Sequence, residues 1–292
     1  MIDGIDSSDD GATELTLRRA SEFTIEELVN AYNQTRIDYI VPMPMNARRL
    51  TEYVRNYDVR LDYSAVAMSD GQILGLSMLG VRPGRCWSTR LGVLPVKRRR
   101  GTGESLMNDN IAMARQLGAK CIILEVIKDN EPAHKLFEKL GFRETRVLLI
   151  LRRPPHPPKE DGIGGYHVTF LDTDDVVRLL AQRRSTPSWL DETPSLINAG
   201  NLAALQVELA NGGWGWLVYQ NTTFQLGRLV LQTEVGDPRE VARTLVHALH
   251  QVHPIKDTNT ENLPLDDPHL PGLLDMGYLE SFRRIEMRRD LK

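Results

Sequence analysis

The sequence has only two cysteines, Cys86 and Cys121, among 292 residues. Two thiols cannot form the disulfide framework of a small secreted protein. No stretch reaches the ~18 uninterrupted apolar residues that a membrane-spanning helix needs, because the richest run, residues 121–127, contains Glu125. The chain also does not begin with a basic, apolar and small-residue leader. We therefore expect a cytoplasmic protein that does not enter a membrane.

Histidine, cysteine and acidic residues with the spacing of a metal site are also lacking, so we expect no metal. Neither cysteine predicts chemistry. Cys121 lies in the apolar run and is expected in the core, and Cys86 beside Trp87 is not expected to be a nucleophile. With 292 residues, the chain is long for one compact domain and fits two domains.

Charge and proline divide the chain. Residues 1–153 contain 23 Lys and Arg against 20 Asp and Glu, and residues 154–292 contain 13 against 19, so the net charges are +3 and −6. A polyanionic ligand would prefer the first half. Four prolines between residues 154 and 158 predict a linker over 154–164. We expect domains at 13–153 and 165–292, preceded by a disordered polar tail over 1–12.

The elements expected in the first half alternate as in a mixed α/β protein. Thr24 and Glu27 have the spacing of a capping box and predict a helix from residue 25. Asp70-Gly71 lies between two apolar runs and predicts a hairpin of residues 64–68 and 73–79. Further helices are expected at 47–57, 102–117 and 132–140, and further strands at 87–94, 121–127 and 147–151.

A basic, glycine-rich loop, KRRRGTG at residues 97–103, lies between an expected strand and an expected helix. The first turn of a helix presents unpaired N–H groups and the positive end of its dipole, so such a loop can bind phosphate. Successive N–H groups from Gly101 to Ser105 could form a concave anion site. Taken alone, the pattern also fits a solvated surface turn or a nonspecific nucleic-acid patch, and it matches neither a P-loop nor a dinucleotide fingerprint.

Two segments give this loop a more specific meaning. Residues 93–103, VLPVKRRRGTG, follow the pattern Arg/Gln-x-x-Gly-x-Gly/Ala, and residues 130–142, NEPAHKLFEKLGF, follow Asn-x-x-Ala-x-x-Leu-Tyr-x-x-x-Gly-Phe. Together they resemble the signatures of the GCN5-related N-acetyltransferase (GNAT) superfamily, and the resemblance covers residues 13–153. It implies a mixed, splayed central sheet flanked by helices, and acetyl-CoA as the co-substrate.

The resemblance also implies which residues contact acetyl-CoA. The pyrophosphate would lie on the basic loop, and the pantetheine would run beside the preceding strand. A backbone N–H of Val93 or Leu94 would support the oxyanion that forms on the thioester carbonyl. The implied contact residues are Leu91, Val93, Leu94, Val96, Arg98, Arg99, Arg100, Gly101, Thr102, Gly103, Glu104, Ser105, Asn130 and Phe137.

Acetylation of an amine needs a group that accepts the amine's proton, and Glu125 is the first candidate. It interrupts an apolar strand, and ribosomal-protein N-acetyltransferases of the resembled family have a base at the matching place in Leu-Glu-Val. The simpler alternative is a strand residue that faces solvent or pairs with an arginine.

The sequence does not identify a single group that protonates the leaving thiolate. Phe137 stands where many family members have a tyrosine with this role. Phenylalanine has no proton to give. Either Tyr63 or a water serves, or the thiolate leaves unprotonated, or the domain catalyses poorly. Tyr39, Tyr53, Tyr57 and Tyr63, near Asp58 and Asp62, are either packing residues or a pocket for a cationic amine.

The second half looks like a repeat of the first. An offset of 136 residues places Gly141 on Gly277, Pro132 on Pro268 and Gly101 on Asp237. The same offset replaces the RRRGTG of residues 98–103 by EVGDPR, so the arginines and both positioned glycines are lost. We expect a degenerate GNAT-like domain that does not bind CoA and that supports the first domain, covers the acceptor cleft or mediates association.

The sequence therefore predicts two tandem GNAT-like domains and an N-acetyltransferase that transfers acetyl from acetyl-CoA to an amine of a small molecule or peptide. A noncatalytic acyl-CoA sensor or interaction module is the alternative. Nucleic-acid binding is not expected, because the net charge is −3. We expect a monomer or homodimer.

Overall fold

The strands of the protein form one mixed sheet. The computed structural model describes residues 15–158 and 163–292, and within these ranges twelve strands are joined in the order β1-β2-β3-β4-β5-β12-β6-β11-β10-β9-β8-β7. The expected mixed α/β fold is confirmed. The expected tail and residues 159–162 of the expected linker lie outside the described residues. No helix within the described ranges is long and apolar enough to span a membrane.

The two halves have similar element orders. The first half contains β1 (Thr16–Arg19), α1 (Ile25–Gln34), α2 (Ala47–Asn56), β2 (Ala65–Ser69), β3 (Gln72–Arg82), β4 (Arg85–Val93), α3 (Thr102–Gln116), β5 (Cys121–Ile127), α4 (Glu131–Lys139) and β6 (Arg143–Arg153). The second half contains β7 (Tyr166–Leu171), α5 (Thr173–Ala181), α6 (Thr193–Ala199), β8 (Leu202–Leu209), β9 (Trp214–Asn221), β10 (Gln225–Val235), α7 (Pro238–Val252), β11 (Asp257–Pro264), α8 (Leu270–Asp275) and β12 (Leu279–Asp290).

Local sequence signals determine where the first elements begin. The Thr24 hydroxyl accepts a hydrogen bond from the Glu27 backbone N–H, and the Glu27 carboxylate accepts one from the Thr24 N–H, so the predicted capping box starts α1. Asp70 and Gly71, at φ 51° and 71°, form the predicted turn between β2 and β3. Helices α1 and α2 cover one face of these strands, and α3 and α4 cover the other.

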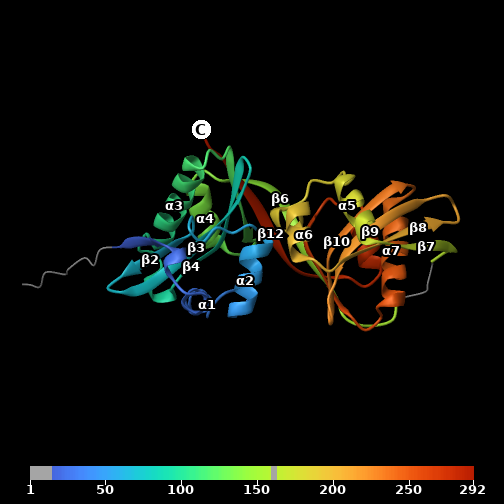
Figure 1. Ribbon diagram of the computed structural model, residues 1–292, viewed down its shortest axis with the longest axis horizontal. Helices are drawn as coiled ribbons and strands as arrows, with labels where there is room; N and C mark the ends of the chain where they lie inside the picture. The colour runs from blue at the N-terminus through green and yellow to red at the C-terminus, as the bar shows by residue number, and fades with distance from the viewer. Residues whose placement is uncertain (1–14, 159–162) are drawn as a thin grey trace, which may run out of the picture.

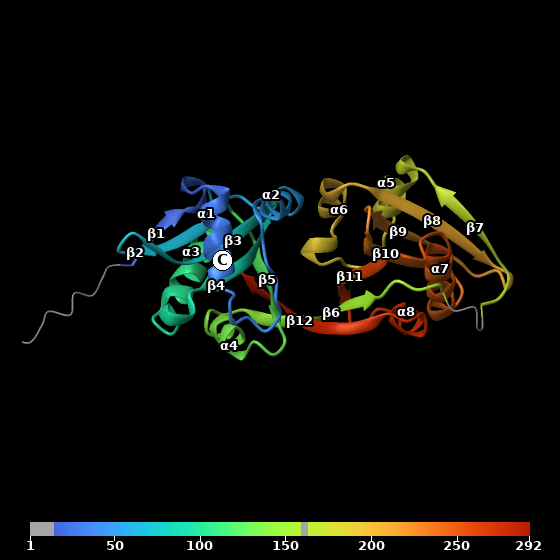
Figure 2. The ribbon, with the colours of Figure 1, turned by 90° about the horizontal axis from the view of Figure 1, so that it is seen from below.

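The two halves exchange their last strands. Strand β12 lies between β5 and β6 of the first half, and β6 lies between β11 and β12 of the second. Figures 1 and 2 show β6 and β12 running side by side from one lobe into the other. The ladder between them pairs Leu148 with Arg284, two residues related by the 136-residue offset of the repeat. An approximate two-fold axis therefore passes through this pair.

This exchange was not predicted, and it changes two expectations. Strand β6 extends over residues 143–153 rather than 147–151, because it is paired with β12 along one edge and with β11 along the other. The expected domains at 13–153 and 165–292 share one sheet, since each half contains the last strand of the other.

A buried ion-pair network also joins the halves. Arg82 on β3 is 7% exposed, and its guanidinium donates to Asp58 (2.8 Å), to Glu192 (2.7 Å) and to the Ser195 hydroxyl (2.6 Å). The guanidinium also lies over the Trp189 ring, 4.2 Å from its centroid. Glu192, Ser195 and Trp189 all come from the second half, so Arg82 connects it to the strand core of the first.

Arg82→Met is expected to lower the free energy of unfolding by about 3 kcal/mol, because it leaves the buried Glu192 with one arginine fewer. Urea unfolding followed by circular dichroism measures the change. Arg60→Met removes an exposed arginine paired with Asp62 and is the control, with an expected change within about 0.5 kcal/mol. A loss of less than about 1 kcal/mol for Arg82→Met would show that the network does not hold the halves together.

Candidate active site

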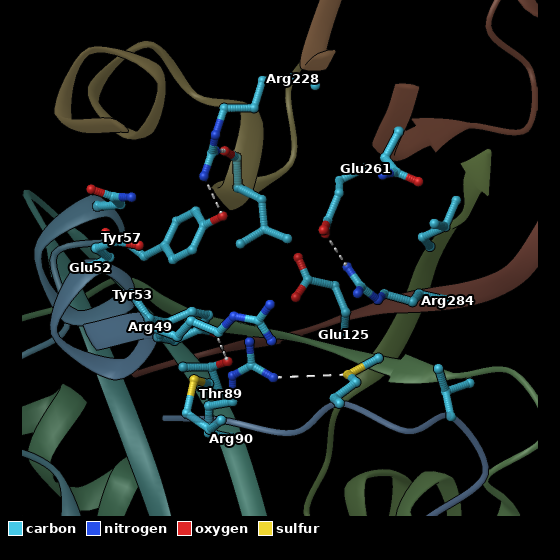
Figure 3. Close-up of a pocket in the computed structure, with 18 of the residues that line it drawn as sticks. Arg49, Glu52, Tyr53, Tyr57, Thr89, Arg90, Glu125, Arg228, Glu261 and Arg284 are labelled. Carbon is cyan, nitrogen blue, oxygen red and sulfur yellow. Dashed lines mark hydrogen bonds and ion pairs between the residues drawn. The ribbon is translucent and has the colours of Figure 1, made fainter. Parts of the chain in front are cut away.

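A cavity of about 680 Å³ lies between the two halves. The first half contributes α2, the loop before it and the ends of β4 and β5, and the second half contributes β10, β11 and β12. Figure 3 shows carboxylates, arginines and tyrosines from both halves pointing into this space. The labelled lining residues are Arg49, Glu52, Tyr53, Tyr57, Thr89, Arg90, Glu125, Arg228, Glu261 and Arg284.

The cavity lies where neighbouring parallel strands separate. Only residues 85–87 of β4 pair with β5, where their partners are residues 121–123. Beyond Trp87 the two strands diverge, as expected for a splayed sheet. A bulge in β4 follows, where two residues after Thr89 face one residue of β3, and Arg90 there has a φ of 54°. Gly92 is required after the bulge, because a Cβ would lie 2.3 Å from the Thr35 hydroxyl oxygen.

The second half repeats this arrangement. Strand β10 pairs with β11 only over Gln225–Gly227, and its ladder with β9 is irregular between Gly227 and Val230. Arg228 lies in that irregular segment with a φ of 52°. Arg90 and Arg228 therefore occupy corresponding bulges, and both line the cavity.

Glu125 lies on β5 where the sheet opens, and its side chain points toward the α1 and α2 face. Its neighbours Leu124 and Val126 pack instead beneath α3 and α4. The Trp87 indole N–H donates to one carboxylate oxygen at 2.9 Å, and the Asn262 amide donates to the other at 3.3 Å. No arginine or lysine of the described residues forms an ion pair with Glu125. Neither simple alternative, a solvent-facing residue or an arginine partner, describes it.

Burial raises the pKa of Glu125 to about 7, and the nearby carboxylates of Glu286 and Glu261 add to the effect. Arg284 and the hydrogen bond from Trp87 act in the opposite direction. A carboxylate with a pKa near neutrality can take up and release a proton under ordinary conditions. Glu125 therefore has the environment of a general base.

Glu261 on β11 is the counterpart of Glu125 under the 136-residue offset, and it faces the same cavity. Its carboxylate accepts a hydrogen bond from Arg284 at 3.1 Å. Burial alone would raise the pKa of Glu261, but Arg284 and Arg228 outweigh this effect and lower it. Two equivalent carboxylates thus have opposite pKa shifts, and Glu261 is the one that stays ionised.

Tyr63, the acid considered from the sequence, does not join this group. It packs with the cluster beneath α3 and α4, on the opposite face of the sheet from Glu125, and it does not line the cavity. Phe137, expected to contact the co-substrate, is 5% exposed and packs against Phe142 in the same cluster. Asn130 caps α4 by accepting a hydrogen bond from the Ala133 N–H at 3.4 Å, and its amide donates to the Tyr39 hydroxyl at 3.3 Å.

The other tyrosines line the cavity, but they do not form an empty aromatic pocket. An arginine guanidinium already lies over each of these rings. Arg36 lies 4.1 Å from the centroid of Tyr39, Arg90 lies 4.1 Å from that of Tyr53, and Arg228 lies 5.2 Å from that of Tyr57. The two aspartates expected nearby are not in the lining either, since Asp58 pairs with Arg82 and Asp62 with Arg60.

The basic loop lies at the start of α3, outside the cavity lining. Arg98 does not offer a free charge, because it donates to both oxygens of Asp38 at 2.7 Å and to the Thr35 carbonyl at 3.0 Å. Arg99 and Arg100 are exposed and form no ion pair within the described part of the chain. Gly101 has a φ of 84°, which favours glycine, and it precedes the helix.

The free N–H groups of this loop are fewer than expected. The Ser105 N–H already donates to the Gly101 carbonyl at 2.9 Å, so it belongs to the helix ladder. Thr102, Gly103 and Glu104 occupy the first turn, where N–H groups have no partner inside the helix. The Glu104 side chain turns away to pair with Lys139 at 2.7 Å. Three N–H groups and two arginines still fit a pyrophosphate.

The strand before the loop can offer one backbone donor. The Leu94 N–H donates to the Leu74 carbonyl at 2.8 Å and is used. In an antiparallel ladder, adjacent residues direct their N–H groups to opposite sides of the strand. The N–H of Val93, the residue before Leu94, therefore faces away from β3 and toward the gap beside β5. The Leu91 carbonyl accepts a hydrogen bond from Arg36 at 3.0 Å, and Val96 is 77% exposed.

The corresponding loop of the second half does not fit a pyrophosphate. Helix α7 begins at Pro238, which has no N–H, and the Asp237 carboxylate accepts a hydrogen bond from the Arg239 N–H at 3.3 Å. The loop has an acidic side chain where the first loop has arginines. Its Gly236 is closely packed, because a Cβ would lie 3.0 Å from the Gly213 Cα.

Sequence reasoning missed most of the cavity's charged residues. The 136-residue offset could have identified Glu261 from Glu125. No local pattern marks Arg90, Arg228 or Arg284, since the first two depend on bulges and the third on strand exchange. Cys121 is buried as expected. Cys86 is also buried, and burial raises the pKa of its thiol to about 11. Among residues 15–158 and 163–292, no three His, Cys, Asp or Glu residues are placed to hold a metal ion.

Comparisons with known proteins agree with these features. Residues 26–142 match the model of the acetyltransferase (GNAT) family. No curated protein matches the chain significantly. A GCN5-related N-acetyltransferase from Sphaerobacter thermophilus is similar over 94% of this chain and 95% of its own, with 13% identity and a TM-score of 0.69.

Two further solved structures are similar along almost the whole chain. A tandem GNAT protein from the clavulanic acid biosynthesis pathway matches 95% of this chain and 98% of its own, with 16% identity and a TM-score of 0.64. The glucosamine N-acetyltransferase region of a fungal multi-domain β-N-acetylglucosaminidase matches 97% of this chain and 39% of its own, with 16% identity and a TM-score of 0.72. The resemblance read from the two motifs is confirmed: residues 26–142 match the GNAT acetyltransferase family model, and the whole chain has the fold of a tandem GNAT protein.

Proposed function

We propose that this protein transfers an acetyl group from acetyl-CoA to an amine of a small molecule or peptide, with Glu125 as the general base. The observation that carries the proposal is a partly buried carboxylate with a pKa of about 7, facing a cavity at the opening of a GNAT-family sheet. In the overall reaction a C–N bond forms, the thioester C–S bond breaks, and the products are an N-acetyl amide and CoA thiol.

Acetyl-CoA would supply the activated acetyl group, and the first half has the residues to hold it. The N–H groups of Thr102, Gly103 and Glu104, together with Arg99 and Arg100, would bind its phosphates. The Val93 N–H would donate along the gap between β4 and β5. Arg98 would act indirectly, by fastening the loop to Asp38.

Glu125 would accept the proton that the amine loses. Hydrogen bonds from Trp87 and Asn262 hold its two oxygens in place, so the carboxylate is oriented before the acceptor binds. Phe137 is buried and Tyr63 lies on the other face of the sheet, so we assign neither a proton-transfer role. Water in the cavity would supply the proton to the leaving thiol.

The second half would complete the acceptor site without binding acetyl-CoA itself. Its loop before α7, residues 234–237, has no basic side chain, and the first helical residue, Pro238, has no N–H. Glu261, Arg228 and Arg284 of this half line the cavity. The Asn262 amide also reaches across to Glu125. Both halves would therefore be needed for activity, although only one would bind the co-substrate.

A noncatalytic acyl-CoA sensor is the second candidate, and the buried Phe137 favours it. The two functions differ in whether CoA thiol is released when amines are added. Release with any amine of a broad panel supports the transferase, and tight acetyl-CoA binding without release supports the sensor.

Glu125→Gln is expected to lower kcat by about 10²- to 10⁴-fold, because the amide cannot accept a proton. The KM for acetyl-CoA is expected to change little, since Glu125 is not among the phosphate-binding residues. Steady-state thiol release measures both constants. Equal losses in kcat and in acetyl-CoA affinity would assign Glu125 a binding role instead.

The pH profile gives a separate test. Because the pKa of Glu125 is raised to about 7 and the base works only when deprotonated, kcat/KM is expected to show a rising limb with a pKa of about 7, below the titration of the acceptor amine. The Glu125→Gln variant should lack this limb and keep only the titration of the acceptor amine. An identical limb in both proteins would contradict the assignment.

Arg99→Gln combined with Arg100→Gln is expected to weaken acetyl-CoA binding by about 10- to 100-fold, because two charge-assisted contacts to phosphate are lost. The matched control is Arg239→Gln, in the first turn of α7, which should leave affinity unchanged. Calorimetric titration gives affinity and stoichiometry together. Two equivalents per chain, or equal weakening by the control, would contradict the division between the halves.

A further inference from the structure

The charged lining of the cavity is unbalanced. It contains the five arginines 36, 49, 90, 228 and 284 and the three glutamates 52, 125 and 261, and no lysine, histidine or aspartate. With all of them ionised the lining has a net charge of +2. A simple cationic amine would be repelled by such a surface, so the lining does not fit an acceptor whose only charged group is its amine.

Most of these arginines also lack a carboxylate partner. Arg284 pairs with Glu261, but within the described ranges Arg36, Arg49, Arg90 and Arg228 form no ion pair. Arg49 is exposed, but Arg36, Arg90 and Arg228 are partly buried. Partial removal of an arginine from water without a counter-ion has a free-energy cost. The cavity is therefore suited to a ligand that brings negative charge.

Arg90 leaves part of its hydrogen-bonding capacity unused. Its Nη1 donates to the Tyr32 hydroxyl at 2.8 Å, and its guanidinium lies 4.1 Å from the centroid of Tyr53. Its Nε is buried and has no partner. Its Nη2 makes no hydrogen bond to any described residue, and it is not among the buried unpaired atoms. The aromatic contacts therefore hold the guanidinium in place and leave N–H groups for a ligand.

Arg228 shows the same features in the second half. Its three hydrogen bonds go to neutral oxygens, those of Tyr57 (2.7 Å), Leu190 (3.2 Å) and Gln220 (3.3 Å). Arg90 and Arg228 both have a positive φ, 54° and 52°, where a non-glycine residue is strained by about 1 kcal/mol. Both halves thus use a strained bulge to direct an arginine into one cavity.

Carboxylates and guanidinium groups both face the cavity. Figure 3 shows the carboxylates of Glu125 and Glu261 next to each other on one side, and the guanidinium groups of Arg90 and Arg228 on different walls around them. A ligand with one basic and one acidic group could place the amine at Glu125 and the acidic group at an arginine.

We infer that the acceptor carries a carboxylate or phosphate group in addition to its amine, and that Arg90 binds this anionic group. The inference rests on the proposed function and narrows its substrate class. The phosphates of acetyl-CoA do not account for Arg90, because the N–H groups and arginines that fit them lie at the start of α3, outside the cavity lining.

Matched pairs of amines, which differ mainly in the anionic group, test the inference. Suitable pairs are phosphoethanolamine and ethanolamine, glucosamine 6-phosphate and glucosamine, and β-alanine and propylamine. Calorimetric titration of the full chain measures binding, and CoA-thiol release measures turnover. For at least one pair, the member with the carboxylate or phosphate group should bind about tenfold or more tightly than the member without it, since a charge-assisted contact supports such a difference.

Variants of Arg90 assign the effect to this residue. Arg90→Met should abolish the preference within the pair, and Arg90→Lys should keep part of it. Arg60→Met is the control, because Arg60 also lies over a tyrosine ring, 4.7 Å from the centroid of Tyr63, but outside the cavity. Thermal melting confirms that each variant is folded.

The outcomes separate this inference from the proposed function. Preferential binding of an anionic member that depends on Arg90 supports the inference even if no thiol is released, in which case the transferase proposal fails alone. Three results would overturn the inference: equal or tighter binding of the members without the carboxylate or phosphate group, no detectable binding of any member with it, or an unchanged preference in Arg90→Met. If thiol is then released with amines that have no carboxylate or phosphate group, the transferase proposal is still supported.

Discussion

The pairing of β6 with β12 at the centre of the sheet is the contact on which the rest of the structure depends. Each of these strands begins in one half and completes the sheet of the other, so neither half has its full set of strand partners alone. The same ladder fixes the distance between β5 and β11, the strands that carry Glu125 and Glu261. The cavity is therefore a product of the exchange, and both halves must be folded for it to exist.

The approximate two-fold axis through this ladder explains why the two halves differ in chemistry. The axis relates Arg284 of the second half to Leu148 of the first. The two halves therefore have a charged and an apolar side chain at equivalent positions. Arg284 pairs with Glu261 and lowers its pKa, whereas Glu125 forms no ion pair with any described residue and its pKa rises. A single unsymmetrical residue thus helps to give two equivalent carboxylates opposite pKa shifts.

Local signals in the sequence predicted much of this structure, and the reasons for the failures are physical. The capping box of Thr24, the turn at Gly71 and the two motifs depend on neighbouring residues, and they are readable. Strand exchange is not, because the apolar pattern of β6 is the same whichever strand lies beside it. Tyr63 is one acid that the sequence allows in place of Phe137, but its side chain lies on the opposite face of the sheet from Glu125. Arg90 and Arg228 face the cavity because each lies in a bulge, where a strand has one extra residue. No pattern in the neighbouring sequence marks such a residue.

The central claim is that one acetyl-CoA site, in the first half, serves a cavity built by both halves. A crystal structure of the full chain with bound acetyl-CoA tests this claim most directly. The account predicts one molecule per chain, with its phosphates at the N–H groups of Thr102–Glu104 and its thioester in the gap beside Glu125. Acetyl-CoA at the start of α7, or a thioester directed away from the cavity, would contradict it.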